Sequence, residues 1–237
     1  MTDAESQADA LTSAQLRELD RLAIEECGLP GVVLMENAGA GAARVALRLL
    51  AGRRAPRVWI AAGPGQNGGD GWVVARWLAN AGADVRVASA LDPRELRGDA
   101  GTHARVALAM GIGHERLAAS ASAAHAEQLA RADLVVDALL GTGARGAPRG
   151  VVGAAVAALE ALAARAGAPP VLALDLPSGL DPDTGARPGA CVRAAITATF
   201  AARKVGFEAP GVAAWLGEIE VVDIGVPRAL FERVRGS

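Results

Sequence analysis

Three glycine-rich segments of the chain carry polar side chains that suit chemistry on a nucleotide. The first is Gly63-Pro-Gly-Gln-Asn-Gly-Gly-Asp-Gly71, which follows the apolar run Val58-Trp-Ile-Ala-Ala62. The glycines at its first, third and sixth positions have the dinucleotide-binding spacing, in which the backbone approaches a phosphate at a helix N-terminus. Asn67 and Asp70 do not suit a plain phosphate site, because a carboxylate repels phosphate unless a cation, a proton or a ribose hydroxyl lies between them. The first segment therefore predicts a nucleotide site with an additional component.

The other two glycine-rich segments each follow an apolar run as well. Residues 134–146 contain Asp137, and residues 172–179 contain Asp175 and Ser178. Each of these polar residues taken alone is as well explained by a helix cap or a turn. Ligands of an open parallel sheet bind beyond the carboxyl ends of the strands, so we expect the three segments to meet in one crevice. Crowded carboxylates repel one another and raise each other's pKa, and a bound cation removes this repulsion. Carboxylate, amide and hydroxyl oxygens suit an alkali or alkaline-earth cation rather than zinc.

The elements that position these segments alternate between apolar strands and helical runs. The pattern predicts strands over 57–62, 84–89, 133–137, 171–175, 194–200 and 218–223. It predicts helices over 12–27, where Thr12-Ser-Ala-Gln15 forms a capping box, and over 32–50, 71–81, 98–110, 122–131 and 151–166. This alternation predicts an α/β domain with a mostly parallel sheet and right-handed crossovers. The last two predicted strands are closer together in sequence than the others. One of them could therefore be antiparallel or lie at an edge of the sheet.

Composition bounds the class of protein. The 237 residues suffice for one large domain, which we expect to span residues 1–237 with residues 1–10 disordered. The formal net charge of −2 argues against a nucleic-acid binder, which would carry a strongly basic face. Two distant cysteines, Cys27 and Cys191, predict neither a disulfide framework nor a zinc site, and both are expected to be buried. No apolar signal segment or membrane span is expected, so the predicted location is the cytoplasm.

Six motifs spread over most of the chain make a more specific resemblance. They are Leu34-Met-Glu-Asn-Ala-Gly39, the first glycine-rich segment, Val136-Asp-Ala-Leu-Leu-Gly-Thr-Gly143, Asp175-Leu-Pro-Ser-Gly179, Thr199-Phe-Ala-Ala-Arg-Lys-Val-Gly206 and Val222-Asp-Ile-Gly-Val-Pro227. In combination they resemble the NAD(P)H-hydrate epimerase family, the N-terminal half of bacterial bifunctional nicotinamide-nucleotide repair enzymes. The resemblance implies a Rossmann-like three-layer αβα sandwich. It also implies an isomerase that interconverts the R and S forms of hydrated NADH and NADPH, and supplies the S form to an ATP- or ADP-dependent dehydratase.

The resemblance also implies site residues. One potassium ion (K+) per subunit is expected on Asn67, Asp137 and Ser178. The hydrated nucleotide is expected on three groups of residues: Gln66, Asn67, Gly68, Gly69 and Asp70; Gly141, Thr142, Gly143, Ala144, Arg145, Gly146 and Ala147; and Asp175. A homodimer is a further expectation, with the N-terminal helices as candidate interface elements.

Proton transfer at the hydrated carbon requires an acid and a base, and Asp175 and Asp70 are the catalytic candidates. Lys204 is expected to contact the ligand or to pair with an acid. Two alternatives remain open at this point. One is an NAD(P)-dependent oxidoreductase, in which Asp92 would bind the ribose. The other is a non-catalytic binding module of the same fold, of the kind found in RNA-processing scaffolds.

Overall fold

The computed structural model describes residues 10–117 and 129–236, and their strands form one seven-stranded, fully parallel sheet. The strand order is β3-β2-β1-β4-β5-β6-β7. The strands are β1 Arg57–Ala62, β2 Asp84–Ser89, β3 Gly113–Arg116, β4 Leu134–Ala138, β5 Val171–Leu174, β6 Ile196–Phe200 and β7 Glu218–Val222. The helices are α2 Ser13–Glu25, α3 Gly31–Leu49, α4 Gln66–Asn80, α5 Gly98–Ala109, α7 Gly150–Ala163, η1 Val205–Glu208, α8 Ala213–Leu216 and α9 Arg228–Arg235.

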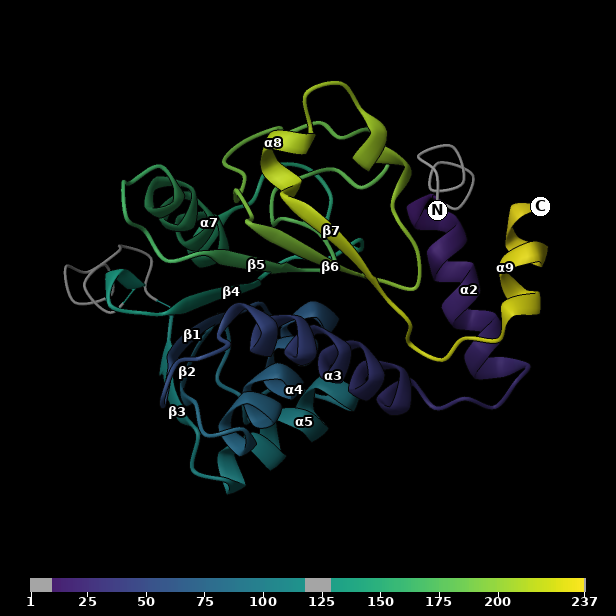
Figure 1. Ribbon diagram of the computed structural model, residues 1–237. Coiled ribbons are helices and arrows are strands. Elements are labelled where there is room, and N and C mark those ends of the chain that lie inside the picture. The colour runs from purple at the N-terminus through teal and green to yellow at the C-terminus, as the bar shows by residue number, and fades with distance from the viewer. Residues whose placement is uncertain (1–9, 118–128, 237) are drawn as a thin grey trace.

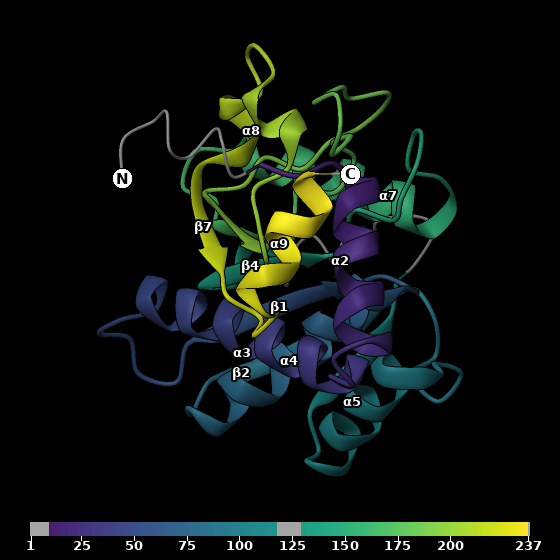
Figure 2. The same ribbon diagram turned by 90° about the vertical axis from the view of Figure 1, so that its right-hand side faces the viewer.

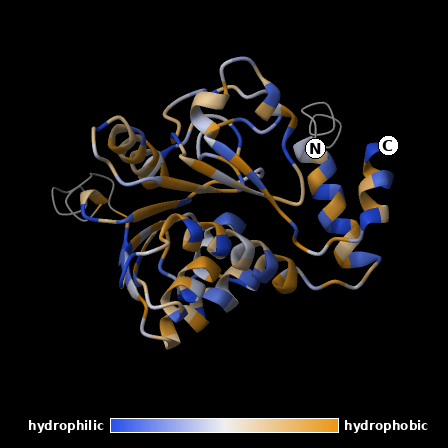
Figure 3. Ribbon diagram, viewed as in Figure 1, coloured by the Kyte–Doolittle hydropathy of each residue, from blue (hydrophilic) through white to orange (hydrophobic). Residues whose placement is uncertain are grey.

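Helices cover both faces of the sheet, which gives the three layers expected for a Rossmann-like fold (Figure 1). Helices α3, α4 and α5 pack on one face, while α7 and α8 lie on the other. Side chains of β1 alternate between the two layers: Ile60 belongs to the core under α3 and α4, and Trp59 to the core under α7. A strand buried on both faces favours apolar residues at successive positions, which explains the hydrophobic run of β5 and that of β4 up to Asp137 (Figure 3).

Helices α2 and α9 stand side by side beyond the carboxyl ends of the strands (Figure 2). The predicted capping box is confirmed, because Thr12 Oγ1 accepts a bond from the Gln15 N–H and the Gln15 side chain accepts from the Thr12 N–H. Just before α2, Leu11 pairs with Lys204 in an isolated parallel bridge. The start of α2 is therefore fixed to the chain that follows β6, and the helix closes one side of the edge where the strands end.

Most predicted elements are confirmed, and the differences have physical reasons. Helix α4 begins at Gln66 rather than at residue 71, so Asn67 and Asp70 lie on its first turns despite the helix-breaking glycines around them. Strand β7 is at the edge and runs parallel, while β3 and α9 were not predicted from the sequence. Strand β3 is short and polar, so it lacks the alternating pattern.

The expected disorder of residues 1–10 and the predicted helix over 122–131 fall almost entirely outside the described residues. Cys27 is exposed, contrary to the prediction, because it follows the end of α2.

Two glycines of α3 allow close packing where larger residues would clash. A Cβ on Gly39 would lie 2.4 Å from Cβ of Val73 on α4, and one on Gly41 would lie 2.1 Å from Cγ1 of Val222 on β7. Within the described residues, no helix is long and apolar enough to cross a membrane.

Gly63 allows the closest backbone approach at the carboxyl end of β1. A Cβ there would lie 1.8 Å from the carbonyl oxygen of Leu139, in the loop after β4. Because the obstacle is backbone, we expect Gly63→Ala to lower the free energy of unfolding by about 1–3 kcal/mol, measured by urea denaturation. Gly143→Ala is the matched control, since its Cβ would meet nothing within 4 Å, and we expect a change within about 0.5 kcal/mol. Equal losses in the two variants would contradict this account of Gly63.

Candidate active site

The loops that follow β1, β4, β5 and β6 meet where the strand order reverses between β1 and β4, the usual position of a ligand in a doubly wound sheet. A cavity of about 540 Å³ opens there, bounded by these loops, the start of α4 and one side of α2. That volume is in the range of small-molecule and cofactor sites. The cavity brings together eight of the residues predicted to bind the nucleotide, namely Gln66, Asn67, Asp70, Gly141, Thr142, Gly143, Ala144 and Asp175.

The remaining predicted nucleotide-binding residues lie outside the cavity lining. Gly68 faces the carbonyl of Gly63, and Gly69 packs against Met35. Arg145 donates to Ser13 Oγ at 2.6 Å and lies 3.7 Å from a carboxylate oxygen of Asp183, so this guanidinium ties the loop after β4 to the start of α2.

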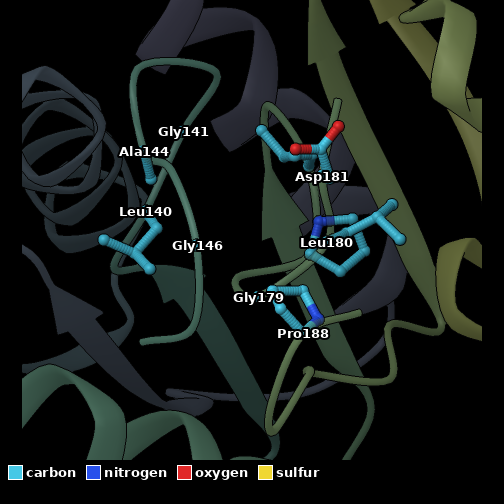
Figure 4. Close-up of a pocket in the computed structure, with 10 residues that line it drawn as sticks. Leu140, Gly141, Ala144, Gly146, Gly179, Leu180, Asp181 and Pro188 are labelled. Carbon is cyan, nitrogen blue, oxygen red and sulfur yellow. The ribbon is translucent and has the colours of Figure 1, made fainter. Parts of the chain in front are cut away.

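A second, much smaller crevice of about 10 Å³ separates the loop after β4 from the segment after β5 (Figure 4). Gly146 lines it, and Asp181 lies on the opposite wall. Neighbouring Ala147 lies against Gly189, where an added Cβ would come within 3.1 Å of the alanine Cβ. A space of this size holds about one water molecule, so a nucleotide fits only in the larger cavity.

Asp175 follows β5 in an unusual backbone conformation. Its φ is +67°, and the Leu176 N–H bonds to the Leu174 carbonyl at 2.8 Å, which closes a three-residue turn around it. The end of β6 repeats this geometry at Ala201, with φ of +61°. Left-handed conformations of residues other than glycine cost about 1–3 kcal/mol and persist where the surrounding structure fixes them, often at functional sites. The two turns direct the Asp175 carboxylate and the chain carrying Lys204 toward the same cavity.

Lys204 confirms the expectation that it pairs with an acid. Its ammonium forms an ion pair with Asp175 Oδ1, and the side chain is fully buried. The ammonium also donates to Thr199 Oγ1 at 2.6 Å and to the carbonyls of Phe200 and Ala202 at 3.2 and 3.3 Å. The other carboxylate oxygen of Asp175 accepts the Thr142 N–H at 3.0 Å. Asp175 is thus held as an anion by a buried cation and a backbone donor.

Asp70 lines the same cavity from α4 but in a different electrostatic environment. Burial raises its pKa well above the usual range, and the charges of Asp175 and Asp20 raise it further, while Lys204 opposes them. Asp70 is therefore suited to carry a proton, whereas the charged form of Asp175 is stabilised by the Lys204 ammonium and the Thr142 N–H. Two carboxyl groups in opposite protonation states in one cavity form an acid and a base.

Asp137 and Ser178 are buried together behind the cavity. Ser178 donates its hydroxyl to Asp137 Oδ1 at 2.7 Å and its N–H to Oδ2 at 2.8 Å. Burial raises the pKa of Asp137 to about 6, opposed by the hydrogen bonds from Ser178 and Leu139. Leu140 joins this pair to the cavity wall, because its N–H donates to Ser178 Oγ at 2.9 Å and its carbonyl accepts from Asn67 Nδ2 at 3.0 Å.

Asn67 provides an observation that bears on a cation. Its Oδ1 is buried and has no hydrogen-bond partner among the described residues. A buried amide oxygen without a donor carries a free-energy cost that a hard cation would remove. The neighbouring oxygens of Asp137 and Ser178 are also hard ligands. Within the described part of the chain, no group of three His, Cys, Asp or Glu side chains offers an alternative metal site.

One ionisable group of the cavity wall, on α2, was not predicted from the sequence. Asp20 lines the cavity together with Leu16 and Ile24, which lie one helical turn before and after it. The surrounding protein partly removes water from Asp20, and the charge of Asp175 acts in the same direction; against the opposing charge of Lys204, they raise the pKa of Asp20 to about 6. The signal that could have found Asp20 is an acid on the same helical stripe as two apolar residues at spacing i±4.

Known proteins similar to this chain match almost its whole length. Residues 31–206 match the family described as YjeF-related protein N-terminus. The NAD(P)H-hydrate epimerase of Pirellula staleyi is 44% identical over 219 residues, covering 92% of this chain and 93% of that enzyme. The NAD(P)H-hydrate epimerase of Rhodopirellula baltica is 42% identical over 229 residues, covering 96% and 88%.

Longer relatives and a solved structure extend the comparison. The bifunctional NAD(P)H-hydrate repair enzyme Nnr of Moorella thermoacetica is 40% identical, and the match covers 93% of this chain but only 41% of that enzyme. The crystal structure of yeast ynu0 has a TM-score of 0.79 and 22% identity, with 95% of this chain and 93% of the yeast chain covered. This last likeness is one of fold.

Proposed function

The chain belongs to the family of YjeF-related protein N-termini, and on that ground we propose that it is an NAD(P)H-hydrate epimerase. It is an isomerase that interconverts the R and S forms of hydrated NADH and NADPH in nicotinamide-nucleotide repair. The structural observation that best supports this function is the pair of carboxyl groups, Asp70 and Asp175, in one cavity with Lys204 beside Asp175.

We propose that this pair carries out acid–base catalysis at the hydrated ring carbon. Asp70 gives a proton to the departing hydroxyl, so that water leaves and the lone pair of the ring nitrogen forms an iminium ion. Asp175 stabilises the cationic ring and is the base for water that returns. Atoms and electrons balance without an oxidant or reductant, in keeping with an isomerase.

The nucleotide-binding assignments remain proposals, and the structure supports them to different degrees. Residues 66–70 form the first turns of α4, whose N-terminus favours a phosphate through its unpaired N–H groups. Residues 141–144 line the cavity opposite them. Arg145, Gly146 and Ala147 would reach the nucleotide only if the loop after β4 changed its conformation.

We also propose that one potassium ion is held by Asn67, Asp137 and Ser178. The partnerless Oδ1 of Asn67 supports this set, and the ion would supply a counter-charge to the buried Asp137 carboxylate. The described residues offer oxygen ligands of the type that alkali cations prefer.

Potassium binding predicts a change in stability that can be read without an activity assay. At a free potassium concentration ten times the Kd, the folded state gains about 1.4 kcal/mol. The protein should therefore melt at a higher temperature in potassium chloride than in choline chloride of equal ionic strength. Asn67→Leu should abolish the difference, since it removes the amide oxygen. Identical melting in both salts would contradict the potassium site.

Further proposals concern partners and location. The bifunctional relatives support a functional link to an NAD(P)H-hydrate dehydratase that consumes the S form. The cytoplasm is the proposed location, because NADH and NADPH are used there. A homodimer through the N-terminal helices stays a prediction; the exposed Val33 on α3 is a residue that such an interface would cover.

A coupled assay tests the function. A dehydratase specific for the S form is given a mixture of R and S hydrated NADPH, with potassium present. Adding this protein should allow the R form to be consumed after the S form is exhausted. Unchanged consumption of the R form would contradict the epimerase assignment.

An oxidoreductase would instead transfer hydride, and Asp92 would bind the ribose. The Asp92 carboxylate, however, accepts the Arg94 N–H at 2.9 Å in a local turn.

A further inference from the structure

Inversion at the hydrated carbon needs proton transfer on both faces of the nicotinamide ring. On one face the C–O bond breaks, and the departing oxygen takes a proton and leaves as water. On the other face water attacks, the C=N electrons return to the ring nitrogen, and the added water loses a proton. Asp70 on the first turns of α4 and Asp175 at the end of β5 both enter the cavity from the sheet side. Two carboxyl groups on one side of the ring can add water back to the face from which it left. They do not by themselves add water to the opposite face, which inversion of the carbon requires.

Helix α2 places a third carboxyl group on the opposite side of the cavity. This helix stands beyond the carboxyl ends of the strands and faces the loops that carry the pair (Figure 2). Leu16 and Ile24 make the adjoining cavity wall apolar, so Asp20 is the ionisable group that α2 contributes to the lining.

The Asp20 side chain is exposed to the cavity and makes no hydrogen bond or ion pair within the part of the chain that the structure describes. Its neighbours on the outer side of α2 differ in this respect: Glu18 and Glu25 are both paired with Arg21. An acid without a structural partner, in a cavity with two other carboxyl groups, is available to exchange a proton with a ligand.

We propose that Asp20 is the acid–base group of the second face, and that it exchanges a proton with the water that leaves or enters on the side facing α2. This inference rests on the proposed epimerase function and adds a residue to it. Asp20 lies outside residues 31–206, the part of the chain that matches the family.

The electrostatics of the cavity are suited to that role. The charged and titratable groups that line the cavity with Asp20 are Asp70 on α4, Asp99 on α5, Asp175 and Lys204. The protein around the cavity partly removes water from the Asp20 carboxyl, and the Asp175 charge acts in the same direction, so that the pKa of Asp20 is raised to about 6. A group with this pKa can give and take a proton near neutral pH. The same residue can then act in both directions of the reaction.

Water labelled with oxygen-18 distinguishes oxygen exchange on one face of the ring from inversion of the hydrated carbon. The full-length protein is incubated with each separated epimer in labelled water, and chromatography with mass spectrometry measures label in both epimers. In the unmodified protein, label enters mainly with inversion. In Asp20→Asn, epimerisation should fall by about 100-fold. One epimer should still exchange its oxygen with retention, because Asp70 and Asp175 still serve their own face.

Two variants serve as controls. Glu18→Gln removes the same charge from the outer side of α2 and should epimerise within about twofold of the unmodified protein, since its ion pair is exposed. Asp20→Glu keeps a carboxyl group and should recover part of the epimerisation rate. Melting curves confirm that each variant is folded.

The outcomes separate the inference from the function on which it rests. Asp20→Asn that epimerises at the unmodified rate would overturn the role of Asp20 alone. Loss of exchange and inversion together in a folded Asp20→Asn would overturn it too, since the residue would then be needed for binding or structure. If the unmodified protein accelerates neither exchange nor inversion, the epimerase function itself fails.

Discussion

Replacement of Asp175 by asparagine should reduce epimerisation by about 100- to 10,000-fold at saturating substrate and potassium. Asparagine keeps the size and the left-handed backbone preference of aspartate but lacks the negative charge and cannot accept the proton. The loss should therefore appear in kcat rather than only in KM. Rates of conversion of each epimer, followed by chromatography, measure the effect.

Asp223→Asn is the matched control for this prediction. Asp223 also follows a parallel strand, but its carboxylate accepts the Gly225 N–H at 2.8 Å in an exposed turn outside the cavity. It represents the ordinary use of aspartate at the end of a strand. Its variant should epimerise within about twofold of the unmodified protein. An Asp175→Asn protein that is folded and equally active would remove Asp175 from the mechanism.

Lys204→Met should lower the free energy of unfolding by about 3–5 kcal/mol, because it leaves the Asp175 carboxylate buried beside Thr142 with no cation. Methionine fills a similar volume, so the loss reports on charge rather than on a cavity. Urea denaturation at neutral pH measures it. Epimerisation should fall as well, because the Asp175 carboxylate loses the cation that stabilises its charged form.

A second substitution distinguishes this explanation from a packing defect. Adding Asp175→Asn to Lys204→Met removes the uncompensated charge, so the double variant should be more stable than Lys204→Met alone. Additive losses from the two substitutions would indicate that Lys204 stabilises the fold through its contacts with Thr199, Phe200 and Ala202 rather than through Asp175.

The sequence predicted the sheet and the meeting of the three glycine-rich segments because both follow from local patterns. Hydrophobic runs bounded by glycine located β1, β4 and β5, and parallel order placed their carboxyl ends at one edge. Asp70 and Asp175 could be named for the same reason, since each lies within or beside such a segment.

What could not be predicted depends on contacts between distant residues. The start of α4 at Gln66 contradicts local propensity, and it is accommodated because Gly71 and Gly68 pack where a side chain would clash. The burial of Lys204 and its pairing with Asp175 depend on two strained turns that no motif specifies. Asp20 was missed because α2 reaches the cavity only through tertiary packing.

The central claim is that the chain inverts the hydrated carbon of NAD(P)H hydrates. It is tested most directly by incubating the purified R epimer of hydrated NADPH with the protein and potassium, then separating the epimers by chromatography over time. We predict rapid formation of the S epimer, and the same final ratio when the reaction starts from S. Interconversion at the rate seen in buffer alone, by a protein shown to be folded, would contradict it.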